Sequence, residues 1–211
     1  MSLELLQQSL QDIYELNVAY RVDDFLFSDR GLAGRLDSGT AFRDVREKLL
    51  VLEDEQGLNL SLFLDESVLD AVSESACQPR AAMQEFCLAM EGVSHFLYLV
   101  WYAHHGRAVT LLEMELQAEI DKYVLLREGI VGGSGGEELL QRLFRRVGFH
   151  ASLGENELQR YLYASRHAEV YCRRLEREYF SGGSRERLLN ELRRFYRLSK
   201  EDKLRRIDGS Y

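Results

Sequence analysis

Proline is almost absent from this chain of 211 residues, in which Pro79 is the only one. Proline removes a backbone N–H and clashes with the preceding turn, so it is the strongest local breaker of helices. Most of the chain is therefore free to be helical, and apolar residues recur through it at the spacing of a buried helix face. The sequence predicts a mainly α fold, a helical bundle of about six to eight helices.

Apolar periodicity and capping residues define the expected helices. They cover residues 3–17, 66–76, 79–105, 110–127, 137–147, 152–180, 184–198 and 199–207. Two of them begin with a capping box, Thr110 to Glu113 and Ser152 to Glu155, in which a hydroxyl and a carboxylate bind free backbone N–H groups. Residues 18–45 mix short apolar pieces with turn residues, and no element is assigned there.

One stretch has the period of a strand instead of that of a helix. From Leu58 to Leu64 every second residue is leucine, and Leu49 to Glu53 is a suitable partner strand. Asp54 to Gly57 supplies the turn, with Gly57 available for a positive φ. We therefore predict one β-hairpin near residues 48–65, whose leucine face must pack on helices because an isolated hairpin is marginally stable.

Composition predicts one cytoplasmic domain spanning residues 1–211. Apolar residues make up 45% of the chain and charged residues 29%, as in ordinary globular proteins. The first residues include Glu4 and Asp12 and lack the basic region of a secretory signal. The longest apolar run, Phe96 to Ala103, is far shorter than the roughly 20 residues of a membrane span, so no transmembrane segment is expected. A candidate flexible break lies at 129–136, where a glycine-rich run is typical of a linker.

The cysteines favour a reducing compartment. Cys77, Cys87 and Cys172 are odd in number and form no C-x-x-C pair, which argues against a disulfide framework and a thiolate zinc site. We interpret them as buried apolar residues. The alternative is a reactive thiol at Cys87, two helical turns before His95.

The expected helix at 79–105 carries the first candidate site. Glu91, His95, Tyr98 and Tyr102 follow one another at spacings of four, three and four, which places four titratable side chains on one line of the helix. A neighbouring helix over this line would bury Glu91 and His95 and make them a candidate acid–base or metal site. The alternative is an ordinary ion pair between Glu91 and His95.

The next helix offers further carboxylates, Glu113, Glu115 and Glu119. Helical bundles build metal sites from inward Glu and His side chains, but the Glu-x-x-His spacing of the ferritin-like sites occurs nowhere in this sequence. The alternative is that Glu113 is a helix cap and that Glu115, Glu119 and Lys122 line a solvated face. The sequence leaves the metal and any cofactor undetermined.

Charge divides the chain into two unlike parts. Residues 1–140 contain 10 Lys and Arg against 25 Asp and Glu, a formal charge of −15, and residues 141–211 contain 17 against 10, a charge of +7. The basic excess is mainly arginine, which suits paired contacts with carboxylates or phosphates. The candidate partner-binding residues are Arg187, Arg193, Arg194, Arg197, Arg205 and Arg206.

Two classes of function remain open from the sequence. We favour an interaction or adaptor protein, which binds a protein partner or a second copy of itself through its acidic N-terminal half and its arginine-rich C-terminal helices. The alternative is a helical enzyme that uses Glu91 and His95. A nucleic acid partner is not expected, because the net charge is −8 and no binding motif accompanies the arginines. The same arginines can instead pair with the chain's own acidic half.

Overall fold

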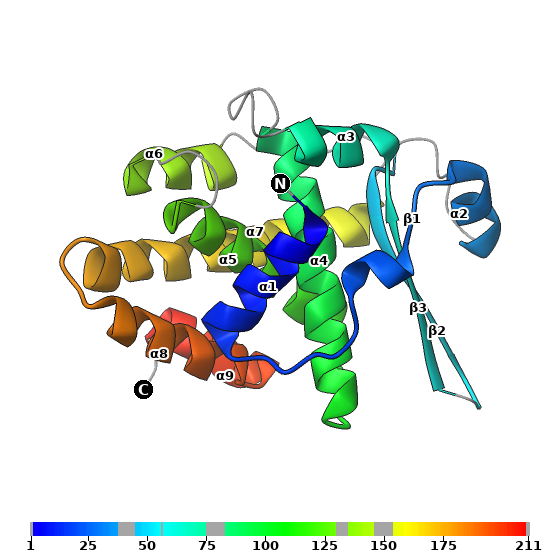
Figure 1. Ribbon diagram of the computed structural model, residues 1–211. Helices are drawn as coiled ribbons and strands as arrows, with labels where there is room; N and C mark the ends of the chain where they lie inside the picture. The colour runs from blue at the N-terminus through cyan, green and yellow to red at the C-terminus, as the bar shows by residue number, and fades with distance from the viewer. Residues whose placement is uncertain are drawn as a thin grey trace.

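The computed structural model describes residues 2–37, 45–55, 57–74, 83–129, 135–145 and 154–209. These residues form nine α-helices and one small sheet of three strands, which confirms the predicted mainly α fold with a β-hairpin (Figure 1). Pro79, Cys77, Ser152 and most of the candidate break at 129–136 lie outside the described residues.

The helix α4 (Met83–His104) is the longest in the described part of the chain. Twelve of its 22 residues are buried, and it contacts α1 (Leu3–Tyr14), α3 (Glu66–Glu74) and α5 (Leu111–Arg127). By length and composition α4 could cross a membrane, but 67% of its apolar window is buried inside the protein. Such burial is typical of the core helix of a globular protein.

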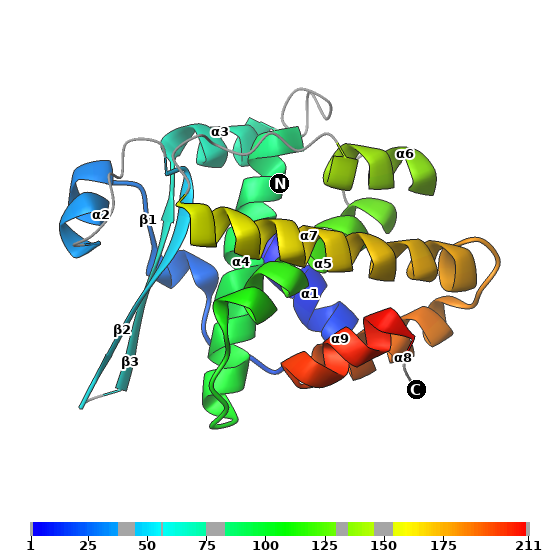
Figure 2. The same cartoon turned by 180° about the vertical axis from the view of Figure 1, so that it is seen from behind.

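The hairpin consists of β2 (Glu47–Asp54) and β3 (Gly57–Leu64), paired antiparallel with Leu49 opposite Leu62. Gly57 has a φ of 133°, a value that favours glycine, and its N–H binds the Asp54 carboxylate at 3.1 Å. The base of the hairpin packs on α4, whereas its far half extends beyond the helices in both Figure 1 and Figure 2.

The segment for which no element was predicted holds a 3₁₀ turn, η1 (Val22–Phe25), a short strand, β1 (Leu26–Phe27), and α2 (Arg30–Leu36). The strand β1 pairs parallel to β3, so the sheet order is β1-β3-β2. The middle of the sheet is therefore β3, and β2 is an edge strand.

Helices α4 and α5 lie between α1 on one side and α7 (Glu155–Leu175) on the other, as the two opposite views show (Figures 1 and 2). The helix α7 ends in a π-helical turn, η3 (Glu176–Phe180). A second π-helical turn, η2 (Gln141–Arg145), follows α6 (Gly136–Leu140). Because α5 is covered from two sides, it is buried on nearly every face. Thirteen of its residues are buried.

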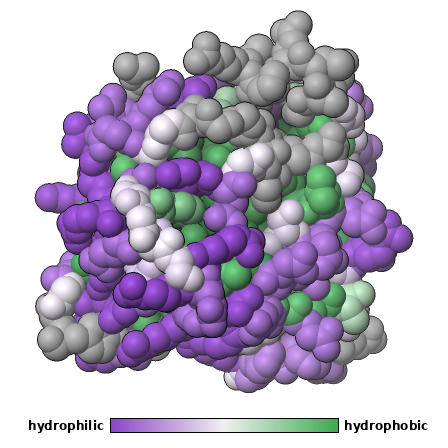
Figure 3. All heavy atoms as spheres, turned by 60° about the vertical axis from the view of Figure 1, so that its left-hand side comes forward, coloured by the Kyte–Doolittle hydropathy of each residue, from purple (hydrophilic) through white to green (hydrophobic). Residues whose placement is uncertain are grey.

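The chain ends in α8 (Arg185–Tyr196) and α9 (Lys200–Asp208). The helix α8 packs on α1, and α9 packs on α7. Ser199 caps α9, because its hydroxyl accepts a hydrogen bond from the Asp202 N–H at 3.1 Å. The face on the left of Figure 1, seen in Figure 3, is mainly hydrophilic with small apolar patches.

Candidate metal centre

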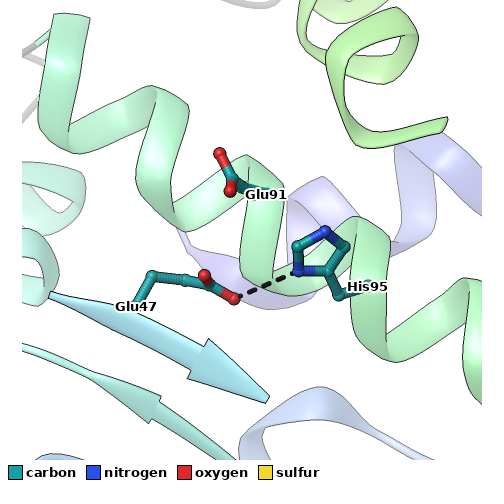
Figure 4. A group of neighbouring side chains, drawn as sticks. All are labelled: Glu47, Glu91 and His95. Carbon is teal, nitrogen blue, oxygen red and sulfur yellow. Dashed lines mark hydrogen bonds and ion pairs between the residues drawn. The ribbon is translucent and has the colours of Figure 1, made fainter. Parts of the chain in front are cut away.

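Three side chains from two elements meet between α4 and the base of the hairpin (Figure 4). Glu91 and His95 lie one turn apart on α4, and Glu47 comes from the first residue of β2. One ligand atom from each of the three lies within 4.8 Å of the others, and His95 Nδ1 is 3.4 Å from Glu47 Oε1. The side chains of His95 and Glu47 are 6% and 7% exposed, so this contact is shielded from solvent.

The other ring nitrogen of His95 faces α5. His95 Nε2 lies 3.7 Å from Glu115 Oε2, which is too long for a hydrogen bond. Among the described residues this buried nitrogen has no hydrogen-bond partner. Arg160 of α7 approaches the same carboxylate from outside, with Nε 3.9 Å from Glu115 Oε1. An imidazole nitrogen buried without a partner is costly, which sets His95 apart from an ordinary packed histidine.

Lys122 joins this cluster to a further carboxylate. Its ammonium lies 2.9 Å from Glu91 Oε2 and 2.6 Å from Glu119 Oε1, and its side chain is 9% exposed. The interpretation of Glu115, Glu119 and Lys122 as a solvated face is therefore wrong. Helix α7 packs over α5 and encloses the face of α5 that carries these three residues.

The cluster holds more carboxylates than cations. Burial raises the pKa of Glu115 to about 8, with the charges of Glu91 and Glu47 adding to it and that of His95 opposing it. Burial would lower the pKa of His95, but the hydrogen bond and charge of Glu47, and the charge of Glu115, raise it to about 9. Burial also raises the pKa of Glu47 and Glu119. The cluster therefore contains several acids whose ionised form a further positive charge would stabilise.

Glu91 responds in the opposite direction. Burial disfavours its charged form, but the charges of Lys122 and His95 outweigh that effect and lower its pKa. Glu91 is therefore the carboxylate of the cluster best prepared to act as an anionic ligand.

The donor set suits a divalent transition-metal ion. Imidazole and carboxylate together are ligands for zinc, iron and manganese, and two ligand atoms about 2.1 Å from one ion are roughly 3.0–3.4 Å apart. The observed 3.4 Å between His95 Nδ1 and Glu47 Oε1 matches that separation. Glu91 has a ligand atom within 4.8 Å of those of Glu47 and His95, and its Oε2 accepts a hydrogen bond from Lys122 at 2.9 Å.

The remaining two members of the predicted line lie elsewhere. The Tyr98 hydroxyl accepts a hydrogen bond from Lys203 of α9 at 3.0 Å, and the Tyr102 hydroxyl donates one to the Tyr196 carbonyl oxygen of α8 at 2.6 Å. At 1.5 Å of rise per residue, Tyr102 is about 16 Å along the helix from Glu91 and meets different neighbours. The structure thus brings Glu91 and His95 together and separates both tyrosines from them.

Most of the candidate partner-binding arginines make contacts within the chain. Arg193 contacts Glu15 at 2.7 Å and the Ile13 carbonyl oxygen at 3.0 Å, and Arg197 donates to the Glu15 carbonyl oxygen at 3.2 Å. These contacts cover the C-terminal end of α1, whose carbonyl groups favour cations.

The arginines of α9 and one of α8 also have partners. Arg206 pairs with the buried Glu191 at 2.6 Å, and Arg205 pairs with Asp202. Arg187 lies 6.0 Å from the Tyr179 ring centre. Arg194 is exposed. Most of these arginines of the basic C-terminal part are therefore engaged by contacts within the same molecule.

The two described cysteines are buried or half-buried and free. Burial raises the pKa of Cys87 to about 12, so its thiol stays protonated at neutral pH. Cys172 lies in the hydrophobic core. This agrees with the interpretation of both as apolar residues and gives no support to a reactive thiol at Cys87.

Glu47 is the residue of the site that sequence analysis missed. It shares a strand face with Leu49, which lies opposite the buried Leu62. Extending the leucine alternation two residues backward would have placed a carboxylate on the face that packs against helices. A carboxylate on an inward strand face is unusual, and this position could have identified Glu47 as a candidate site residue.

Comparisons of the chain with protein-family models, with curated proteins and with solved structures found no match. The geometry of the cluster is therefore the basis for a functional assignment.

Proposed function

We propose that this protein is a metal-dependent enzyme whose centre is formed by Glu47, Glu91 and His95. The observation that carries the proposal is the meeting of these three donors, of which His95 is buried and Glu47 and Glu91 are half-buried, with one ligand atom from each within 4.8 Å of the others. Three protein ligands leave coordination positions open for water and substrate, as in catalytic sites.

The neighbouring carboxylate has a separate role in this proposal. His95 Nδ1 faces Glu47, which makes this nitrogen the ligand and leaves Nε2 to donate to Glu115. A carboxylate behind a metal-bound imidazole fixes its orientation and tautomer. Glu115, 3.7 Å away, would take this position after a small closing movement.

The reaction class that fits this centre is hydrolysis of a small substrate. A divalent ion lowers the pKa of bound water and polarises an oxygen of the substrate. Glu119 and Lys122 border the centre, where the Lys122 ammonium contacts both Glu119 and Glu91.

Metal content of the purified full-length chain tests the proposal. We expect about one equivalent of manganese, iron or zinc after incubation and desalting. We also expect that His95→Ala and Glu91→Gln lower the affinity for the metal at least about tenfold, because each removes a ligand. Equal metal content in wild type and both variants would contradict the proposal.

His167→Ala is the matched control. His167 lies on α7, where its Nδ1 contacts the Tyr163 carbonyl oxygen at 2.8 Å, away from the centre. This variant should bind metal as wild type does. A parallel loss of metal in His167→Ala would show that the measured binding is not at the centre.

We also propose a cytoplasmic location, which two observations support. Cys87 and Cys172 are free, as is usual in reducing compartments. The single membrane-length apolar helix among the described residues is mostly buried in the core. Fractionation of cells that express the tagged chain should recover it with cytoplasmic markers, and recovery in the membrane pellet would contradict the location.

A further inference from the structure

The far half of the β2–β3 hairpin exposes apolar side chains that no described helix covers. Val51 on β2 is 48% exposed, and Leu58 on β3 is 38% exposed. Figures 1 and 2 show this part of the hairpin projecting beyond the helical body. We call residues 51–55 and 57–60 the arm.

One face of the arm continues the face that packs on α4. The register pairs Val51 with Leu60 and Glu53 with Leu58, and these four side chains lie on the same side of the sheet as Leu62. Leu62 is fully buried at the base. The arm face therefore carries three apolar side chains and one carboxylate, and it is the exposed continuation of a core surface.

The edges of the arm are also open among the described strands. The strand β2 is the edge of the sheet, and β1 pairs with β3 only at Leu62 and Phe63. An exposed edge strand presents unpaired N–H and C=O groups to which another chain can bind. The open edges and the exposed apolar face of the arm are therefore available to a partner.

The outer side of α7 has the complementary pattern. Leu162 and Val170 are 48% and 49% exposed, and the exposed Arg166 lies between them at four-residue spacing. Within the described part of the chain no ion pair is formed by Arg166 or by Glu53. The α7 stripe, residues 162, 166 and 170, therefore offers apolar contacts on both sides of one free cation.

We propose that the arm of one copy docks on the α7 stripe of a second copy, with Glu53 facing Arg166. Val51, Leu58 and Leu60 of one copy then cover Leu162 and Val170 of the other. Because both surfaces belong to every copy, the contact can occur twice around a twofold axis and close the assembly as a dimer. This inference does not depend on the metal centre.

Sedimentation velocity of the full chain tests the proposed dimer over a range of concentrations. We expect a species with twice the 24.5 kDa mass of one chain. Val51→Asp should weaken the dimer at least about tenfold, because it puts an unpaired charge into the apolar contact. A wild-type chain that stays monomeric, or a dimer unaffected by Val51→Asp, would overturn the proposal.

A charge exchange tests the pairing itself. Glu53→Arg and Arg166→Glu should each weaken the dimer, and the double variant should restore it, because the two charges again attract. Failure of the double variant to restore a dimer lost in both single variants would overturn the proposed docking. Far-UV circular dichroism of each variant establishes that it is folded.

Leu111→Asp is the matched control for Val51→Asp. Leu111 is 57% exposed and opens α5, where an acidic residue favours the helix dipole. This variant should leave the dimer unchanged. Equal loss in both variants would show that any added surface acid disrupts association, which contradicts a specific arm contact.

Discussion

Lys203 is a lysine with no exposed surface, and its ammonium has no carboxylate in direct hydrogen-bonding contact among the described residues. It donates to the Tyr98 hydroxyl at 3.0 Å and to Gln117 Oε1 at 2.8 Å, and it lies over the Tyr98 ring at 4.6 Å. Burial lowers its pKa to about 7, opposed by the charge of Asp121. One residue of α9 is thereby tied to α4 and α5.

The lowered pKa of Lys203 predicts a specific pH dependence of stability. Between pH values of about 7 and 10.5 the unfolded chain binds a proton that the folded chain has lost, so this residue adds stability as pH rises. That stability is lost progressively as pH falls from about 10.5 to about 7. Urea unfolding should show the free energy of wild type rising relative to that of Lys203→Met from about pH 6.5 to pH 9.5.

Lys200→Met provides the comparison for that measurement, because Lys200 pairs with Glu201 at the surface of the same helix. Its free energy of unfolding should follow that of wild type at each pH. If Lys203→Met also follows wild type in parallel, Lys203 does not titrate as stated.

Glu91 and His95 could be identified from the sequence, but the residues that complete their site could not. Their four-residue spacing on an apolar helix is a local pattern, so it is readable in one sequence. Glu47 and Glu115 reach them from a strand and another helix, 48 and 20 residues away from His95 in sequence. Such contacts depend on tertiary packing, which no local pattern specifies.

Between elements, Gly92 sets how closely α4 approaches the hairpin. A Cβ at this position would lie 3.0 Å from Leu62 Cδ1 and 3.3 Å from Glu47 Cγ. The absence of a side chain therefore lets β2 carry Glu47 to within reach of His95.

This close approach predicts a loss of metal binding without any change of ligand. Gly92→Val should push β2 away from α4 and weaken metal affinity at least about tenfold, because ligands must be held within about 0.5 Å. Gly154→Val is the control, because nothing lies within 4 Å of a Cβ there. Calorimetric titration with Mn²⁺ measures both, and unchanged affinity in Gly92→Val would contradict the positional role of Gly92.

The elements themselves were largely predictable, for reasons that can be named. The capping box at Thr110 forms as expected, with the Glu113 N–H bound to Thr110 Oγ1 at 3.3 Å, because it is a local interaction. The parallel pairing of β1 with β3 was not predicted, because a strand of two residues has too little pattern to recognise. The solvated face that the sequence offered for Lys122 was wrong, because the burial of α5 depends on the helices that pack over it.

Across the whole molecule, the division between an acidic and a basic part has two uses. Within one chain, Arg193 and Arg206 join α8 and α9 to α1 and to Glu191. Between chains, we propose that Arg166 of α7 meets the acidic arm of a second copy. The sequence shows the charges. Only the fold distinguishes an arginine that forms an ion pair within its own chain from one that can pair with a partner.

Glu47, Glu91 and His95 are proposed to hold one metal ion. X-ray diffraction from crystals grown with Mn²⁺, recorded to reveal anomalous scattering, would locate that ion. We expect one strong anomalous peak within about 2.0–2.3 Å of a nitrogen of His95 and of an oxygen from Glu47 and Glu91. A metal-loaded crystal with no peak between these side chains, or with peaks only at surface carboxylates, would contradict it.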